Sequence, residues 1–170
     1  MTASSPHSVH RIGVYPGTFD PFTNGHLDLV TRSRSLFDQV IIAIAANLDK
    51  RPLFSAKERL EMVQEAIQPL THVTVEIFEG LLVNFARARH AQSIIRGLRA
   101  VSDFEYELQI ALMNRKLDGH IETIFLMPSE EYTYLTSTIV KAVARHQGAI
   151  DAFVPPGVGR RLKERFGARR

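Results

Sequence analysis

Short apolar runs alternate along the chain with longer stretches in which apolar residues recur every three or four positions. Runs of the first kind are typical of strands, and stretches of the second kind are typical of helices with one buried face. The strands are expected at residues 11–15, 39–46, 72–78, 92–97 and 121–127. The helices are expected at residues 26–37, 55–68, 81–90, 103–117 and 137–148, with a short one after Gly157. This order predicts an α/β fold with a doubly wound, five-stranded parallel sheet of Rossmann-like type.

Two side-chain patterns predict helix ends. Ser55 and Glu58 have the spacing of a capping box, in which each side chain bonds the backbone N–H of the other residue at the start of a helix. Gly148 follows the helix predicted at 137–148, and we assign it to the C′ position, where the backbone is commonly left-handed.

Length and composition favour a single domain with one apolar core. The chain has 170 residues, of which 45% are hydrophobic. Residues 1–10 are polar and lack the apolar stretch of a secretory signal, so we expect a disordered tail followed by one domain over 11–170. No apolar run approaches the roughly 18 residues that a membrane span needs. The chain contains no cysteine, which excludes disulfides and thiolate metal sites and is compatible with a reducing compartment.

Positive charge is concentrated at the C-terminus. The net charge of the chain is +3, yet the last eleven residues hold six Lys or Arg and one Glu, which leaves 15 basic and 17 acidic residues elsewhere. A basic tail can bind nucleic acid. This one lacks the repeated aromatic residues of a stacking platform, so we interpret it as the solvated end of the last helix.

Groups that bind phosphate follow the predicted strands. In parallel α/β sheets, ligands bind at the carboxyl ends of the strands, near the point where the strand order reverses. The segments after the strands contain His26, Lys50, Arg96, Arg99 and a run of hydroxyls over 136–138. The loops at the opposite ends show no such concentration, so the sequence predicts an anion site at the carboxyl edge.

The loop after the first strand, 16–26, is rich in turn residues and ends on a histidine. Gly17 and Gly25 would let the backbone approach a ligand closely. His26 falls in the first turn of the next helix, where free N–H groups favour an anion. Taken alone, the loop fits a helix cap with a surface histidine equally well. Asp20 in this loop is either a metal ligand or a structural turn residue, and we prefer the structural role.

Several motifs together resemble a known family. The run Thr23-Asn24-Gly25-His26 resembles the (H/T)xGH motif of a nucleotidyltransferase superfamily, and Leu135-Thr136-Ser137-Thr138 resembles its late hydroxyl-rich motif. The stretches at 94–117 and 125–148 closely resemble bacterial phosphopantetheine adenylyltransferases. The likeness extends over about residues 11–155. Two departures are the threonines that replace serines of the late motif and the N-terminal extension.

The resemblance implies transfer of the adenylyl group of ATP to 4′-phosphopantetheine, giving dephospho-coenzyme A and pyrophosphate by direct in-line displacement. Because the attacking phosphate is already an anion, such a reaction needs positioning and charge stabilisation rather than an acid or a base.

Roles for individual residues also follow from the resemblance. His26 would stabilise the transition state, and Thr18, Lys50 and Arg96 would act with it. Phosphopantetheine would contact Thr18, Lys50, Leu82 and Arg96, with Leu82 along its pantetheine arm. ATP would contact Thr18, Phe19, His26, Gly97, Leu98, Arg99, Glu107, Tyr132, Thr133, Tyr134, Leu135, Thr136, Ser137 and Thr138.

The resemblance further implies Mg²⁺ as the partner of the ATP phosphates, a homohexamer, a cytoplasmic location and coenzyme A as a candidate ligand. The remaining histidines are scattered without ligand spacing, so we assign no metal site held by the protein alone. We expect neither a nucleic-acid nor a membrane partner.

Three alternatives stay open. The first is a related transferase acting on nicotinamide mononucleotide or using CTP; the stretch at 94–107 argues against both, and such relatives tend to carry Arg where Lys141 stands. The second is a nucleotide-binding regulator without catalysis, which the presence of His26, Lys50 and Arg96 disfavours. The third is a nucleic-acid binder that uses the basic tail, whose binding would weaken steeply with salt.

Overall fold

Strands and helices alternate along the chain in the computed structural model, which describes residues 10–46 and 52–167. The strands are β1 (Ile12–Gly17), β2 (Gln39–Ala45), β3 (Val73–Phe78), β4 (Ser93–Gly97) and β5 (Glu122–Leu126). The helices are α1 (Asn24–Ser33), α2 (Ala56–Ile67), α3 (Leu82–Ala88), α4 (Val101–Leu117), a 3₁₀ turn at Glu130–Tyr132, α5 (Ser137–Arg145) and α6 (Pro156–Gly167).

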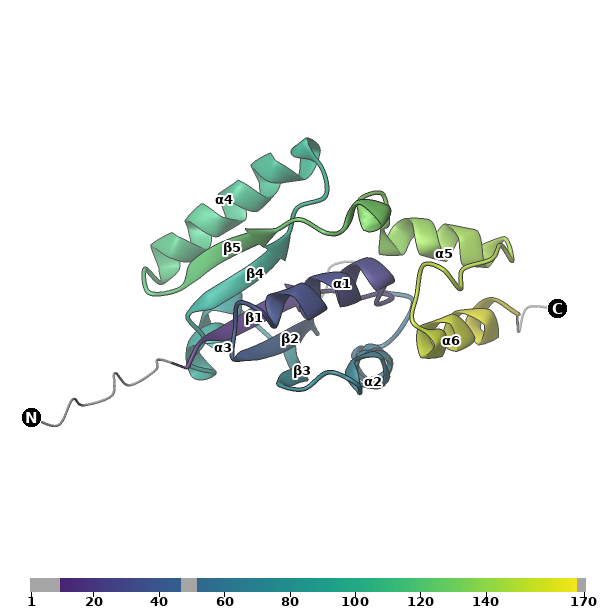
Figure 1. Cartoon of the computed structure of the whole chain (residues 1–170), viewed down its shortest axis with the longest axis horizontal. Coiled ribbons are helices and arrows are strands. Elements are labelled where there is room, and N and C mark those ends of the chain that lie inside the picture. Colours follow the sequence, from purple (N-terminus) through teal and green to yellow (C-terminus); the bar gives the residue numbers. More distant parts are fainter. Residues whose placement is uncertain (1–9, 47–51, 168–170) are drawn as a thin grey trace, which may run out of the picture.

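The five strands form one parallel sheet in the order β3-β2-β1-β4-β5 (Figure 1). In the middle of the sheet, Val14 of β1 lies opposite Ile41 of β2 and Ile94 of β4. The order reverses between β1 and β4, so the loops after these two strands diverge at the carboxyl edge. The predicted fold class is confirmed.

Two apolar layers cover the sheet. On one face, α1 and α2 bury Val30 and Val63 against Ile42 and Ile44 of β2. On the other face, α3 buries Val83 and Ala86 in a smaller cluster. Strands covered on both faces read as continuous apolar runs, as β2 does. Beyond the carboxyl ends of the strands, α5 and α6 extend the larger layer (Figure 1).

The helix ends agree with one of the two predicted signals. Ser55 caps α2, and its capping box with Glu58 is present. At the end of α5, however, the left-handed residue is Gln147, with φ of 59°, and the assignment of Gly148 to C′ is wrong. The N–H groups of Gln147 and Gly148 donate to the carbonyls of Ala144 and Val143, so this end is a Schellman motif with Gly148 one position later.

Residues 160–167 of the basic C-terminal segment belong to α6, which packs its apolar side against the larger core and leaves Arg160 and Lys163 largely exposed, as expected of a solvated helix end. Val158 and Leu162 of α6 are buried in the larger core. Arg161 pairs with Glu61 at 2.9 Å and Arg160 with Glu65 at 2.6 Å. Arg165 pairs with Glu58 in the same way. Three acidic residues of α2 therefore pair with three of the basic side chains of α6. No helix among residues 10–46 and 52–167 is long and apolar enough to cross a membrane.

Candidate active site

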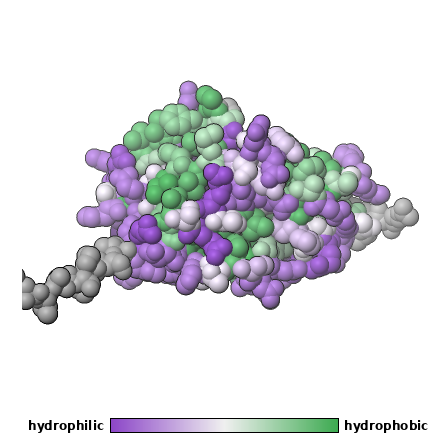
Figure 2. All heavy atoms as spheres, in the orientation of Figure 1, coloured by the Kyte–Doolittle hydropathy of each residue, from purple (hydrophilic) through white to green (hydrophobic). Residues whose placement is uncertain are grey.

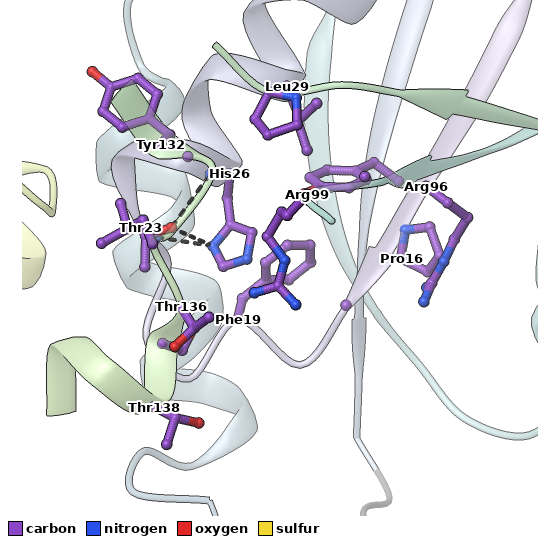
Figure 3. Close-up of a pocket in the computed structure, with 17 residues that line it drawn as sticks. Pro16, Phe19, Thr23, His26, Leu29, Arg96, Arg99, Tyr132, Thr136 and Thr138 are labelled. Carbon is purple, nitrogen blue, oxygen red and sulfur yellow. Dashed lines mark hydrogen bonds between the residues drawn. The ribbon is translucent and has the colours of Figure 1, made fainter. Parts of the chain in front are cut away.

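A cavity of about 410 Å³ opens at the carboxyl ends of β1 and β4, where the strand order reverses (Figure 3). Its walls come from the loop after β1, the start of α1, the end of β4 and the start of α5. The lining residues are Tyr15, Pro16, Gly17, Phe19, Thr23, Gly25, His26, Leu29, Arg96, Gly97, Arg99, Pro128, Tyr132, Leu135, Thr136, Ser137 and Thr138. The cavity therefore lies where the sequence predicted an anion site.

The spacing of Thr23 and His26 has a local structural cause. Thr23 is the N-cap of α1 and His26 is its N3 residue, and the two form a capping box in which histidine takes the place of the usual glutamate. The backbone N–H of Thr23 donates to Nδ1 of His26 at 3.0 Å, and the backbone N–H of His26 donates to the Thr23 hydroxyl. The box fixes the orientation of the imidazole ring at the cavity wall (Figure 3).

This arrangement also determines where the His26 ring carries its proton. Burial, reinforced by the charge of Arg99, lowers the pKa of His26 to about 4, so the ring is neutral at pH 7. Because Nδ1 accepts from Thr23, the single ring proton resides on Nε2. His26 therefore offers the cavity a neutral N–H donor.

Two arginines bring positive charge to the opposite wall. Arg96 forms a bidentate pair with Glu107 of α4, with its Nε and Nη2 donating over 2.7 and 2.6 Å. Burial lowers the pKa of Arg96, but the hydrogen bond and charge of Glu107 outweigh this effect and the net shift is upward. Arg99 pairs with Asp103 one turn further along the chain. Both cations are thus held by carboxylates that fix their direction.

Two helix N-termini reach the same cavity. At α5, the Thr136 side chain accepts from the backbone N–H of Ile139, and the Ser137 hydroxyl donates to the carbonyl of Pro21 over 2.8 Å. At α1, Gly25 and His26 lie on the cavity wall. Free N–H groups and the positive ends of helix dipoles favour an anion here. The arrangement as a whole can bind a polyphosphate.

The two glycines of the loop leave room for neighbouring side chains. A Cβ atom on Gly17 would lie 2.7 Å from the Phe19 ring, and one on Gly25 would lie 3.3 Å from Cβ of Tyr132. Both glycines also line the cavity, so a close approach of a ligand to their backbone stays a prediction.

Asp20 has the structural role that we preferred. Its carboxylate accepts from the backbone N–H groups of Leu53 and Phe54, each over 2.9 Å, and from Nζ of Lys141 over 2.6 Å. The residue is 4% exposed. Asp20 therefore ties the loop after β1 to the start of α2 and to α5, and Lys141 neutralises its charge.

The structure places most of the predicted ATP residues together. Those on the cavity wall are Phe19, His26, Gly97, Arg99, Tyr132, Leu135, Thr136, Ser137 and Thr138, and Arg96 lies there too. Predicted residues that do not line it are Thr18, Leu82, Leu98, Glu107, Thr133 and Tyr134. Glu107 instead bonds Arg96, and Leu82 packs at the edge of the smaller core. Lys50 lies outside the described residues.

Sequence reasoning missed several residues of the site. Tyr15, Leu29 and Pro128 line the cavity. Arg59 and Lys141 hold the loop after β1 from behind. A signal existed for Arg59, since it occupies the buried stripe of α2 with Met62 and Val63 at helical spacing. No pattern in the sequence links Lys141 to Asp20, 121 positions away.

None of the described residues that line the cavity is an Asp or a Glu. Among residues 10–46 and 52–167, no group of three or more His, Cys, Asp or Glu side chains could hold a metal ion. Mg²⁺ in nucleotide sites is usually bound through phosphates with one or two carboxylates and water. The carboxylate of Asp20 is already engaged by three donors.

The chain is similar to several known proteins. The family model described as cytidylyltransferase-like matches residues 14–143. A phosphopantetheine adenylyltransferase from Oleidesulfovibrio alaskensis is 52% identical over 157 residues, which is 92% of each chain. One from Nitratidesulfovibrio vulgaris is 53% identical over 92% of this chain and 84% of its own. One from Alkaliphilus metalliredigens is 50% identical over 85% of this chain and 92% of its own.

A solved structure has the same fold at low sequence similarity. It is described as "Putative Nicotinate-nucleotide Adenylyltransferase" from Vibrio parahaemolyticus, with a TM-score of 0.64 and 16% identity over 91% of each chain. At this identity the likeness concerns the fold alone.

Proposed function

The chain belongs to the phosphopantetheine adenylyltransferase family, and from that premise we propose that the cavity between β1, β4 and α5 is its active site. The family forms dephospho-coenzyme A from ATP and 4′-phosphopantetheine in coenzyme A biosynthesis. The observation that carries the proposal is the neutral His26, which is fixed by its capping box and faces a wall with Arg96 and Arg99.

The proposed step is an in-line displacement without a covalent enzyme intermediate. A phosphate oxygen of phosphopantetheine forms a bond to the α-phosphorus of ATP while the bond from that phosphorus to the bridging oxygen of pyrophosphate breaks. Negative charge grows on the transferring group, and the Nε2–H of His26 donates to it. A fixed donor in a partly desolvated site stabilises such charge without reorganisation.

Substrate contacts are divided between the two sides of the cavity. We assign the phosphate of phosphopantetheine to Arg96 and Lys50, with Leu82 along the pantetheine arm and Thr18 beside the reacting phosphates. Arg99 and the start of α5, over 136–138, would hold the phosphates of ATP. Glu107 would act on the phosphopantetheine side by orienting Arg96, since it bonds two guanidinium nitrogens. The remaining ATP contacts follow the family assignment.

Mg²⁺ is proposed to accompany ATP and to supply charge neutralisation on its phosphates. A cytoplasmic location is proposed from the family's role in coenzyme A biosynthesis. We also propose a homohexamer. Support for assembly comes from α4, on which Val101, Leu112 and Met113 are more than half exposed. Figure 2 shows apolar side chains gathered over this helix.

The test is pyrophosphate release from ATP, and in parallel from CTP, with a panel of acceptors: phosphopantetheine, nicotinamide mononucleotide and none, each with and without Mg²⁺. We expect turnover with phosphopantetheine alone, dependence on Mg²⁺ and preference for ATP over CTP. Equal turnover with nicotinamide mononucleotide would contradict the proposed acceptor and support the related transferase instead.

A further inference from the structure

Among the described residues, the largest fully buried side chain is the charged Arg59 of α2, which is 1% exposed. It lies on the same face of the helix as Met62 and Val63, within the apolar layer. Burial lowers the pKa of Arg59, and the charge of Asp20 offsets part of this shift. Taking a guanidinium out of water is costly unless its donors are satisfied, so the position of Arg59 needs a physical reason.

Arg59 donates three hydrogen bonds to backbone carbonyls of three separate segments. Its Nη1 donates to the carbonyl of Thr18 over 2.6 Å and to that of Ala45 over 3.0 Å, and its Nε donates to the carbonyl of Phe54 over 3.2 Å. Thr18 is in the loop after β1, Ala45 is the last residue of β2, and Phe54 immediately precedes the N-cap of α2.

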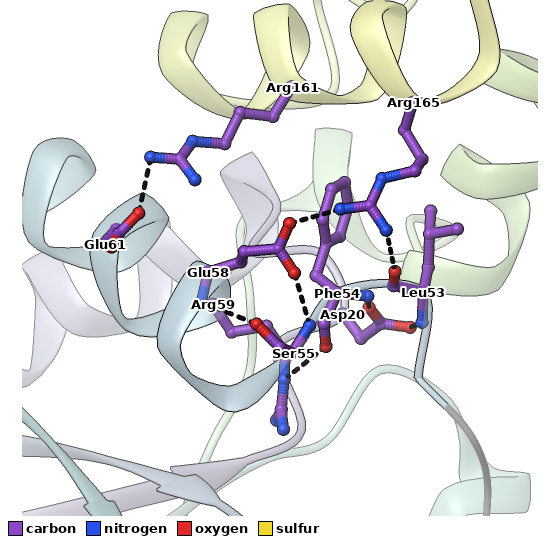
Figure 4. A network of polar contacts seen from close by, with 9 residues as sticks. All are labelled: Asp20, Leu53, Phe54, Ser55, Glu58, Arg59, Glu61, Arg161 and Arg165. Atoms are coloured by element: carbon purple, nitrogen blue, oxygen red, sulfur yellow. Dashed lines mark hydrogen bonds and ion pairs between the residues drawn. The ribbon is translucent and has the colours of Figure 1, made fainter. Parts of the chain in front are cut away.

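Asp20 makes the complementary set of contacts. It accepts from the N–H groups of Leu53 and Phe54, while Arg59 donates to the carbonyl of Phe54 (Figure 4). The loop after β1 is therefore joined to the start of α2 through both kinds of backbone group. Packing alone would need only an apolar side chain of similar size, without the cost of taking a charge out of water.

We propose that Arg59 is a positioning residue for adenylyl transfer, which fixes the loop after β1 against the end of β2 so that Thr18 and His26 keep their reacting geometry. The inference rests on the proposed function, because it takes Thr18 and His26 as the residues that meet the reacting phosphates. It assigns Arg59 no contact with substrate. Its effect should appear in kcat more than in the binding of ATP, whose other contacts come from β4 and α5.

The test compares Arg59→Lys with the wild type and with Met62→Ala. Lysine keeps the charge and the stem but has one compact ammonium group, which cannot serve three carbonyls in this fork geometry. Met62 is equally buried in the same helix, and none of its contacts reaches the loop through a hydrogen bond. The measurements are thermal unfolding, ATP affinity by calorimetry, and kcat and KM well below the melting temperature.

For Arg59→Lys we expect kcat to fall by about a hundredfold, the typical cost of a small misplacement of reacting groups, while the Kd for ATP changes by less than about threefold. Met62→Ala should lower the melting temperature and keep kcat near the wild-type value. If Arg59→Lys fails to fold, Arg59→Gln provides the same comparison with one amide donor and no buried charge.

A folded Arg59 variant with wild-type kcat would overturn the proposal, as would a loss of kcat in Met62→Ala equal to that in Arg59→Lys. Failure of the proposed function would look different, because the wild type itself would then not turn over phosphopantetheine.

Discussion

At the scale of single residues, His26 satisfies two requirements that few side chains could meet together. The N3 position of a capping box needs an acceptor for the N–H of Thr23, which glutamate or glutamine usually provides. A glutamate there would place negative charge beside the phosphates. Histidine accepts with Nδ1 and still donates with Nε2, so the residue that caps α1 also serves the anion.

We expect His26→Ala to lower kcat by about a hundred- to thousandfold, which is the usual loss when one preorganised donor to a developing charge is removed. ATP affinity should change far less, because the proposed contact strengthens in the transition state. Steady-state rates beside calorimetry check this. His120→Ala, at a fully exposed side chain, is the control. A near-normal kcat in His26→Ala would show that the imidazole acts only as a helix cap.

The proton on His26 gives a second expectation. In the free enzyme its pKa is lowered to about 4, while the unfolded chain titrates near 6.5. As the pH falls from 6.5 towards 4, His26 binds a proton in the unfolded state but not in the folded state, so the free energy of unfolding decreases. His26→Ala should lack this part of the decrease.

Nitrogen-detected NMR of the imidazole ring measures the same property directly. We expect an unprotonated Nδ1 and a protonated Nε2 at pH 7, with no titration of His26 between pH 6 and pH 7. A normal titration there would show that the ring becomes charged near neutral pH. That result would contradict the assignment of His26 as a neutral N–H donor.

At the scale of secondary-structure elements, the sequence predicted a helix end correctly where the stabilising contacts lie within one helical turn. Ser55 and Glu58 predicted the start of α2 because both partners lie within one turn. The start of α1 at Asn24 was placed two residues late, since a histidine at N3 does not match the usual box. The end of α5 was misassigned because hydrogen bonds to Val143 and Ala144, not residue type, make Gln147 the left-handed position.

That misassignment yields a prediction. A side chain in the left-handed region costs roughly 1 kcal/mol, and glycine avoids this cost. We expect Gln147→Gly to stabilise the fold by about 0.5–1 kcal/mol, measured as a shift in the denaturant midpoint. Gly148→Ala should instead destabilise it, because a Cβ there would lie 2.6 Å from Cγ1 of Val143. A loss of stability in Gln147→Gly would mean that its side chain contributes more than the strain it carries.

At the scale of the whole molecule, what could be read from the sequence was the sheet, its carboxyl edge and the groups gathered there. The contacts between distant positions could not be read. Asp20 and Lys141 meet across 121 positions, and Arg96 finds Glu107 on another element. Charge counting likewise placed the basic residues on the last helix but could not show that the acids of α2 face them. Such pairs depend on how the elements pack against one another. The hydrophobic pattern along the sequence predicts the elements but not their packing.

The exposed apolar side chains of α4 are a further feature of the whole molecule, and they carry the last prediction. Seven of the large exposed hydrophobic residues belong to this helix, among them Leu112 at 54% and Met113 at 60%. An apolar surface of this kind is typical of association sites, and the proposed occupant is another copy of the chain.

We therefore expect Leu112→Glu to shift the mass measured by light scattering at micromolar concentration from that of a hexamer towards smaller species. A buried carboxylate without a partner opposes association strongly. Leu36→Glu is the matched control, since Leu36 is 42% exposed in the turn after α1 and should leave assembly intact. The free energy of unfolding of the single chain should change little in either variant, because both side chains already face solvent there. A wild-type protein with the mass of one chain would refute the assembly itself. A hexamer that tolerates Leu112→Glu but not Leu36→Glu would move the interface away from α4.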